Sequence, residues 1–240
     1  MLFEELSFHE TPLGELTLRR RAEPRLNDVV IYEVKLGDEF LMSSLFTVGE
    51  RALATLGLAR LGNTHGLEVV VGGLGLGYTA AEALKDERVT SLVVIDALGE
   101  VINWHRSHLV PLGEELSGDE RCRLICGDFF ALASKPGAGF DYDAPGRQFD
   151  AILLDIDHST EHWLSPSNES FYGPDALRTM ARHLVPGGVF AMWSDAKPDV
   201  RFVASLEAAF VAVTADEVTF PNPYTNGESS CTIYVGQTAD

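Results

Sequence analysis

Residues 70–78 read Val-Val-Gly-Gly-Leu-Gly-Leu-Gly-Tyr. Three of these glycines, Gly73, Gly75 and Gly77, follow a short apolar run and precede a segment with helical character. A turn made of glycines lets the backbone approach a ligand closely, because side chains would otherwise fill that space. The stretch predicts a strand, a tight turn and a helix that together bind a nucleoside, and a turn without a ligand is the alternative.

The same order of apolar strand, loop and helix repeats after residue 67. We expect further strands at 91–95, 123–125, 151–154 and 189–193, helices between them, and two strands near 218 and 232–235. Apolar strands that alternate with helices predict a doubly wound, Rossmann-like α/β fold with a mostly parallel sheet. Ligands bind to such a sheet at the carboxyl ends of its strands.

The first 62 residues have a different pattern. Short alternating runs with glycine-containing turns predict a small N-terminal β-hairpin unit. Thr47 and Glu50 have the spacing of a capping box, which opens a helix that runs to about Ala59. We therefore expect an N-terminal β-hairpin/helix unit over residues 1–62 and a nucleoside-binding catalytic domain over residues 63–240.

The charge and composition exclude several kinds of partner. Acidic side chains outnumber basic ones by 36 to 18, and a surface this negative repels the phosphates of nucleic acids. Three cysteines are too few for a disulfide scaffold. No segment approaches the roughly 18 apolar residues that a membrane helix needs. We expect a cytoplasmic protein with no nucleic-acid or membrane partner, acting on a small molecule that is cationic or neutral.

Two acids follow successive predicted strands. Asp96 comes about 20 residues after the glycines, where a carboxylate can accept hydrogen bonds from ribose hydroxyls. Asp128 follows the third strand, where it can accept from an adenine amino group while the ring of Phe129 packs against the base. The alternative is that both acids only cap helices.

Asp155, Asp157 and His158 follow the fourth predicted strand. A carboxylate or imidazole at this place can take a proton from an amine that acts as nucleophile. We expect Asp155 to be the base and the other two to be further bases or substrate anchors, and the alternative is that Asp155 caps the next turn. His158 also begins a His-x-x-Glu-His pattern, but Pro166 interrupts any helix soon after it, so we expect no metal site.

The segment from His158 to Tyr172 is long and polar for a loop in a compact domain, which predicts a lid over the substrate. We expect Trp163 and Tyr172 in this segment, and Tyr224 near the end of the chain, to contact the substrate. Trp163 has the alternative role of holding the loop against the core.

Together these motifs resemble the spermidine synthase family within the class I S-adenosylmethionine-dependent methyltransferase superfamily. The resemblance covers most of the chain and is carried by residues 72–130, 149–155, 171–172, 186–188 and 221–227. It implies a class I methyltransferase-type fold and a sulfonium nucleoside, either S-adenosylmethionine or decarboxylated S-adenosylmethionine. It also implies a homodimer.

The chain departs from the family pattern at four positions. Gly75 stands where the family has the aspartate that holds the donor amine, and Val94 where it has the ribose-binding acid. His158 replaces the second acid, which grips the diamine, and Met42 replaces a glutamine. Because the aspartate is absent, we expect methyl transfer to a small acceptor rather than aminopropyl transfer to a polyamine. Aminopropyl transfer and a non-catalytic nucleoside-binding module are the alternatives.

Overall fold

Seven strands form the large sheet of the computed structural model, which describes residues 2–240. Their order is β10-β11-β9-β8-β5-β6-β7, and β10 and β11 are antiparallel to their neighbours while the other five strands run parallel. The predicted doubly wound, mostly parallel sheet is confirmed. The strands are β5 (Leu67–Gly72), β6 (Val89–Asp96), β7 (Cys122–Cys126), β8 (Phe149–Leu154), β9 (Leu184–Ser194), β10 (Val211–Asn222) and β11 (Gly227–Gln237).

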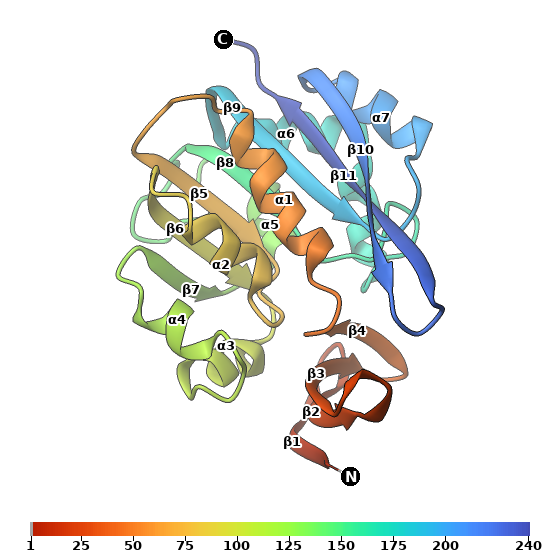
Figure 1. Cartoon of the computed structure of the whole chain (residues 1–240). Helices are drawn as coiled ribbons and strands as arrows, with labels where there is room; N and C mark the ends of the chain where they lie inside the picture. Colours follow the sequence, from red (N-terminus) through yellow and green to blue (C-terminus); the bar gives the residue numbers. More distant parts are fainter. Residues whose placement is uncertain (1) are drawn as a thin grey trace.

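The N-terminal unit contains a four-stranded antiparallel sheet with the order β1-β2-β3-β4. Its strands are β1 (Phe3–Thr11), β2 (Gly14–Glu23), β3 (Val29–Leu36) and β4 (Glu39–Ser43). We call it the small sheet. It lies across one end of the large unit, close to α3 (Gly99–Arg106) and to the turn of the β10–β11 hairpin (Figure 1).

Helices cover both faces of the large sheet. One face packs against α1 (Val48–Ala59), α2 (Tyr78–Leu84), α3 and α4 (Gly113–Gly118), and the other against α5 (Phe129–Ala133), α6 (Pro174–Ala181) and α7 (Val200–Glu207). Successive side chains of β5 alternate between the two faces of the sheet. Val69 and Val71 belong to one core cluster and Val70 to the other. Burial on both faces is why these strands are continuous apolar runs in the sequence.

Helix α1 ends where the sequence predicts, but its start is different. The Thr47 side chain makes no capping hydrogen bond to the helix. Instead its hydroxyl accepts a hydrogen bond from Arg51 Nε at 3.3 Å, and the buried Glu50 lines a cavity. The predicted capping box is therefore wrong. The helix packs on the large sheet, where a Cβ atom on Gly57 would lie 2.8 Å from Leu153.

Polar and apolar contacts hold the small sheet in place. Trp104 Nε1 of α3 donates to Ser7 Oγ at 3.0 Å, and the Tyr224 hydroxyl donates to Glu23 Oε2 at 3.0 Å. Leu16 and Leu18 of β2 are fully buried in the same core cluster as the helices of one face. The small sheet is thereby fixed over the carboxyl ends of the parallel strands.

No helix within residues 2–240 is both long and apolar enough to cross a membrane.

Leu53 tests the packing of α1 on the large sheet, because its side chain is fully buried. We expect Leu53→Ala to lower the free energy of unfolding by about 2–5 kcal/mol, as buried leucines do when a cavity is left behind. Urea unfolding followed by circular dichroism measures the change. Val200→Ala, at a residue that is 79% exposed, is the control and should change stability by less than about 0.5 kcal/mol. Equal losses in the two variants would contradict the packing.

Candidate functional site

A cavity of about 370 Å³ lies between the carboxyl ends of the central parallel strands and the small sheet. We call it the main cavity. The glycine loop after β5 and the ends of β6 and β8 form one wall, and the small sheet and its β1–β2 turn form another. The segment after β8 closes a third side through Leu164, Ser165, Ser167 and Asn168.

Two of the three predicted glycines line this cavity. Gly73 has a φ of +94°, and a side chain there would overlap the carbonyl oxygen of Asp155. Gly75 has a φ of +47°, and the sulfur of Met42 fills the place that its side chain would take. Gly77 is not part of the lining, so its position gives no support to its prediction as a ligand contact. It packs below the loop, where a Cβ atom would lie 2.5 Å from Leu116.

His105 supports the glycine loop from below. It is fully buried, and its Nε2 lies 2.9 Å from the carbonyl oxygen of Gly75. Burial lowers the pKa of His105, so the ring is neutral at pH 7 and Nε2 carries the hydrogen that it donates. The sequence does not reveal this residue, because a histidine within a helix has no local feature that separates it from a surface histidine.

Asp96 lines the cavity, and its carboxylate also holds the loop. Its two oxygens accept hydrogen bonds from the backbone N–H groups of Leu74 at 3.0 Å and Leu98 at 2.8 Å. Burial raises the pKa of Asp96 in spite of these bonds. Each carboxylate oxygen has a second lone pair, so binding to a ribose stays a prediction for this residue.

Asp128 and Phe129 also lie in the cavity wall. Asp128 is exposed and accepts a hydrogen bond from Ala131 N at 3.0 Å, so it does cap a helix, α5. Phe129 is 1% exposed and stacks on Phe140 with ring centroids 5.0 Å apart. Its ring is therefore mainly a core side chain, and the half-buried Phe130 beside it is a second aromatic residue of the lining.

Asp155 forms an acidic pair with Glu50, a residue that is not among the site residues predicted from the sequence. Its Oδ2 accepts a hydrogen bond from the Thr79 hydroxyl at 2.6 Å, and both Asp155 and Glu50 line the cavity. Burial raises the pKa of both carboxyls, and the charge of Asp155 raises that of Glu50 further. Glu50 was missed because its spacing from Thr47 is also that of a helix cap.

Asp157 is not among the residues that line the main cavity, so its position gives no support to its prediction as a base. It is 4% exposed, and its oxygens accept from Leu164 N at 2.7 Å, Asn168 Nδ2 at 3.0 Å and the Tyr172 hydroxyl at 2.6 Å. Burial and the neighbouring Asp157 raise the pKa of Tyr172. Tyr172 is likewise outside the cavity lining, so its position gives no support to the predicted substrate contact. Asp157 instead anchors the lid segment to the end of β8.

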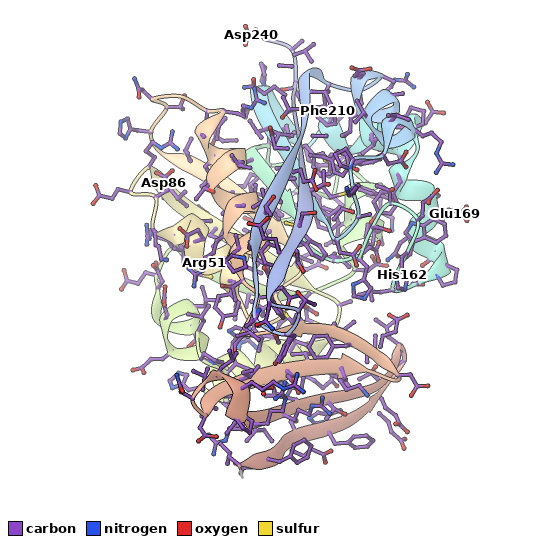
Figure 2. The ribbon with its side chains drawn as sticks, turned by 45° about the vertical axis from the view of Figure 1, so that its right-hand side comes forward. Arg51, Asp86, His162, Glu169, Phe210 and Asp240 are labelled. Atoms are coloured by element: carbon purple, nitrogen blue, oxygen red, sulfur yellow. The ribbon has the colours of Figure 1, made fainter. Side chains whose placement is uncertain are left out.

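His158 does line the cavity, and it also faces the small sheet. Its Nε2 is 3.8 Å from one oxygen of Glu39, whose other oxygen is 3.3 Å from His162 Nε2. Figure 2 shows His162 on the side of the large unit that faces the small sheet. Within residues 2–240, no group of three or more His, Cys, Asp or Glu residues has the arrangement of a metal site.

The other two aromatic residues predicted to contact substrate lie elsewhere. Trp163 Nε1 donates to the carbonyl oxygen of Thr160 at 3.0 Å, and the ring packs against the core, as its alternative role has it. The Tyr224 hydroxyl accepts from Arg21 at 3.0 Å and donates to Glu23. Neither residue lines the main cavity, so the positions of both give no support to the predicted substrate contacts. Tyr224 instead joins the β10–β11 hairpin to the small sheet.

The curated proteins similar to this chain include two polyamine aminopropyltransferases, and no protein-family model matches it. The protein from Pyrobaculum islandicum is 22% identical over 152 residues, which are 63% of this chain and 49% of that protein. Polyamine aminopropyltransferase 2 from Pseudomonas aeruginosa is 24% identical over 170 residues, 68% of this chain and 45% of that protein. The chain thus spans about half the length of the curated relatives that it matches.

Solved structures of spermidine synthases have the same fold. The enzyme from Thermotoga maritima superposes with a TM-score of 0.70 at 15% identity, covering 98% of this chain and 73% of that one. A spermidine synthase in complex with the transition-state analogue AdoDATO gives a TM-score of 0.71 at 16% identity, covering 98% and 74% of the two chains. The resemblance to a spermidine synthase-like family with a class I methyltransferase-type fold is confirmed.

The acidic pair predicts how stability changes with pH. Glu50 and Asp155 bind their protons more tightly in the folded chain than in the unfolded one, where carboxyl pKa values are about 4. The free energy of unfolding therefore falls as pH rises from about 4 toward the raised pKa values. We expect Glu50→Gln to make this fall smaller, by about 1.4 kcal/mol for each unit of pKa difference removed.

Urea unfolding at a series of pH values from 4 to 8 measures this effect. Glu207→Gln removes an exposed carboxylate from α7 and is the matched control. A Glu50→Gln protein that loses stability with pH as steeply as the control would show that Glu50 is not buried beside Asp155.

Proposed function

We propose that this protein is an aminopropyltransferase, which moves the aminopropyl group of decarboxylated S-adenosylmethionine to the amino group of a small acceptor. One observation carries the proposal. The main cavity is lined by four carboxylic acids, Glu50, Asp96, Asp128 and Asp155, and by no lysine or arginine among the described residues.

This charge pattern distinguishes the two sulfonium nucleosides. S-adenosylmethionine carries a carboxylate that would need a cationic or N–H partner in a wall made of acids. The decarboxylated form lacks that carboxylate and has two positive charges, the sulfonium and the ammonium, so its charge is complementary to the wall. The names of the curated relatives, polyamine aminopropyltransferases, agree with this choice of donor.

Methyl transfer, which the sequence analysis favours because Gly75 replaces an aspartate, is not supported by the comparisons. The cavity lining also offers a physical reason to prefer aminopropyl transfer to methyl transfer. Met42 fills the space beside Gly75, and Glu50 brings a carboxyl to the same cavity from helix α1. We propose that Glu50 takes over the role of the acid that the glycine loop lacks, which reduces the significance of Gly75.

Asp155 is the proposed base. The acceptor nitrogen attacks the methylene carbon bound to the sulfonium sulfur, the C–S bond breaks, and its electron pair neutralises the sulfur to give a thioether. The nitrogen loses one proton, which the Asp155 carboxylate accepts. The raised pKa of Asp155 suits this step, because a base works best when its pKa is near the pH at which it acts.

Other residues of the cavity position the two substrates. Asp96 and Asp128 are proposed to bind the ribose and the adenine, with Phe129 and Phe130 against the base. His158 is proposed to contact the acceptor from the lid side of the same cavity. Alignment of the attacking nitrogen, carbon and sulfur supplies much of the rate, because the positive sulfur is already a good leaving group.

The remaining expectations stay predictions. We propose a cytoplasmic homodimer, as the family resemblance implies, that acts on a cationic acceptor and has no nucleic-acid or membrane partner. Gel filtration with light scattering measures the assembly, and a mass of one chain would contradict the dimer.

Asp155→Asn tests the proposed function. We expect this variant to release methylthioadenosine from decarboxylated S-adenosylmethionine about 10²–10⁴ times more slowly than the natural protein, because it has lost the general base. The assay supplies a mixture of small primary amines, putrescine among them, and follows the nucleoside product by chromatography. Calorimetric titration should show that the variant still binds the donor.

Asp195→Asn, at an exposed position after β9, is the matched control and should keep full activity. A natural protein that transfers a methyl group from S-adenosylmethionine, and does not react with the decarboxylated form, would overturn the proposal. Binding of both nucleosides without any turnover would instead favour the non-catalytic module.

A further inference from the structure

A second, smaller cavity of about 140 Å³ adjoins the main one. Leu41, Met42, Glu50 and Trp193 line both cavities and form the wall between them. The rest of the second cavity comes from β4, the segment before α1, the first turn of α1, and β10, with the residues Phe40, Ser43, Phe46, Gly49 and Phe220. It therefore lies where the small sheet, the start of α1 and the β10–β11 hairpin meet.

Four of the nine residues that line the second cavity are aromatic. Phe46 and Phe220 pack with their ring centroids 6.0 Å apart, and Phe40 and Trp193 complete the set. The space is open to solvent on one side, where Phe40 is 46% exposed, and the apolar rings on its other sides favour burial of hydrocarbon. The size and lining of this space thus suit a compact hydrocarbon group.

Glu50 is the one ionisable residue among the described residues of the second lining. It is 9% exposed, and no side chain in the described part of the chain donates a hydrogen bond to its carboxyl group. The adjacent Arg51 is paired with Glu82 at 2.7 Å. The Thr79 hydroxyl, which donates to Asp155, lies 3.3 Å from the backbone carbonyl oxygen of Glu50 and does not bond to its carboxyl group. A cation placed at Glu50 would offset the cost of burying this acid.

Gly49 allows the indole of Trp193 to form part of this wall. A side chain at residue 49 would overlap Trp193 Nε1 and would lie 3.0 Å from the sulfur of Cys231. The absence of a side chain therefore lets the ring pack directly against the start of α1. Aromatic faces of this kind attract a nearby ammonium group as well as hydrocarbon.

We infer that the second cavity is a subsite for the acceptor, and that the acceptor is a primary monoamine with an apolar group about as large as a benzene ring. Its nitrogen lies at Glu50, between the two cavities, and its hydrocarbon lies among Phe46, Trp193 and Phe220. This inference rests on the proposed function and names its substrate class. A linear diamine fits less well, because its second ammonium would enter a space with no second carboxyl group.

Transfer assays with two acceptors test this inference. Decarboxylated S-adenosylmethionine is the donor, and 2-phenylethylamine is compared with putrescine. We expect a higher kcat/KM for 2-phenylethylamine with the natural protein. Phe220→Ala should lower kcat/KM for this amine at least tenfold, mainly through KM, and change the value for putrescine less than twofold. Phe8→Ala, which removes a 47% exposed ring from β1, is the control and should alter neither value.

A preference of the natural protein for putrescine, or an equal loss for both amines in Phe220→Ala, would overturn the inference. If Phe220→Ala does not fold, Phe220→Leu keeps apolar bulk and should show a loss of at least threefold for 2-phenylethylamine alone. An equal loss for both amines in this variant overturns the inference in the same way.

Calorimetry separates this inference from the proposed function. Protein saturated with methylthioadenosine is titrated with 2-phenylethylamine, and we expect binding that Phe220→Ala weakens at least tenfold. No turnover with any amine would reject the proposed function, yet this titration would still decide whether the subsite exists. Failure of the natural protein to bind the amine, with turnover of putrescine intact, would reject the subsite alone.

Discussion

The ends of β5 and β8 come so close together that only glycine fits at the contact, and the candidate site depends on this approach. The backbone N–H of Asp155 donates to the carbonyl oxygen of Gly72 at 2.8 Å, and Gly73 then turns the chain over the Asp155 carbonyl with a positive φ. A side chain at residue 73 would separate the strand ends or redirect the loop. The glycine loop and the Asp155 carboxyl group are therefore held at one edge of the sheet.

The carboxyl groups around the cavity raise the electrostatic free energy of the folded protein when no cation is bound there. Glu50 is 9% exposed and Asp155 is half-buried, and the nearby Arg51 is engaged elsewhere, in its pair with Glu82. Burying like charges costs folding free energy, and a bound cation reduces that cost. The same arrangement that destabilises the free protein thus favours a positively charged ligand.

Contacts between distant segments account for two unusual glycines. The sulfur of Met42, from the small sheet, occupies the place beside Gly75 and accepts a hydrogen bond from Leu76 N at 3.1 Å. The Trp193 ring, from β9, occupies the place beside Gly49. In both cases a large side chain from one segment fills the space that a glycine leaves in another, so the shape of the two cavities depends on pairs of residues.

The sequence by itself determined the order of strands and helices, the glycine loop, and the position of Asp155 at the end of the fourth parallel strand. These features depend on local periodicity and on the rule that parallel strands end at one edge of their sheet. Only the tertiary structure decided which acids face the cavity. Asp157 lies two residues after Asp155, but its carboxylate turns away and bonds to Tyr172. Glu50 does not cap its helix as predicted and instead lines the cavity. The direction of a side chain is set by the distant segments that pack around it, and a linear pattern does not contain those contacts.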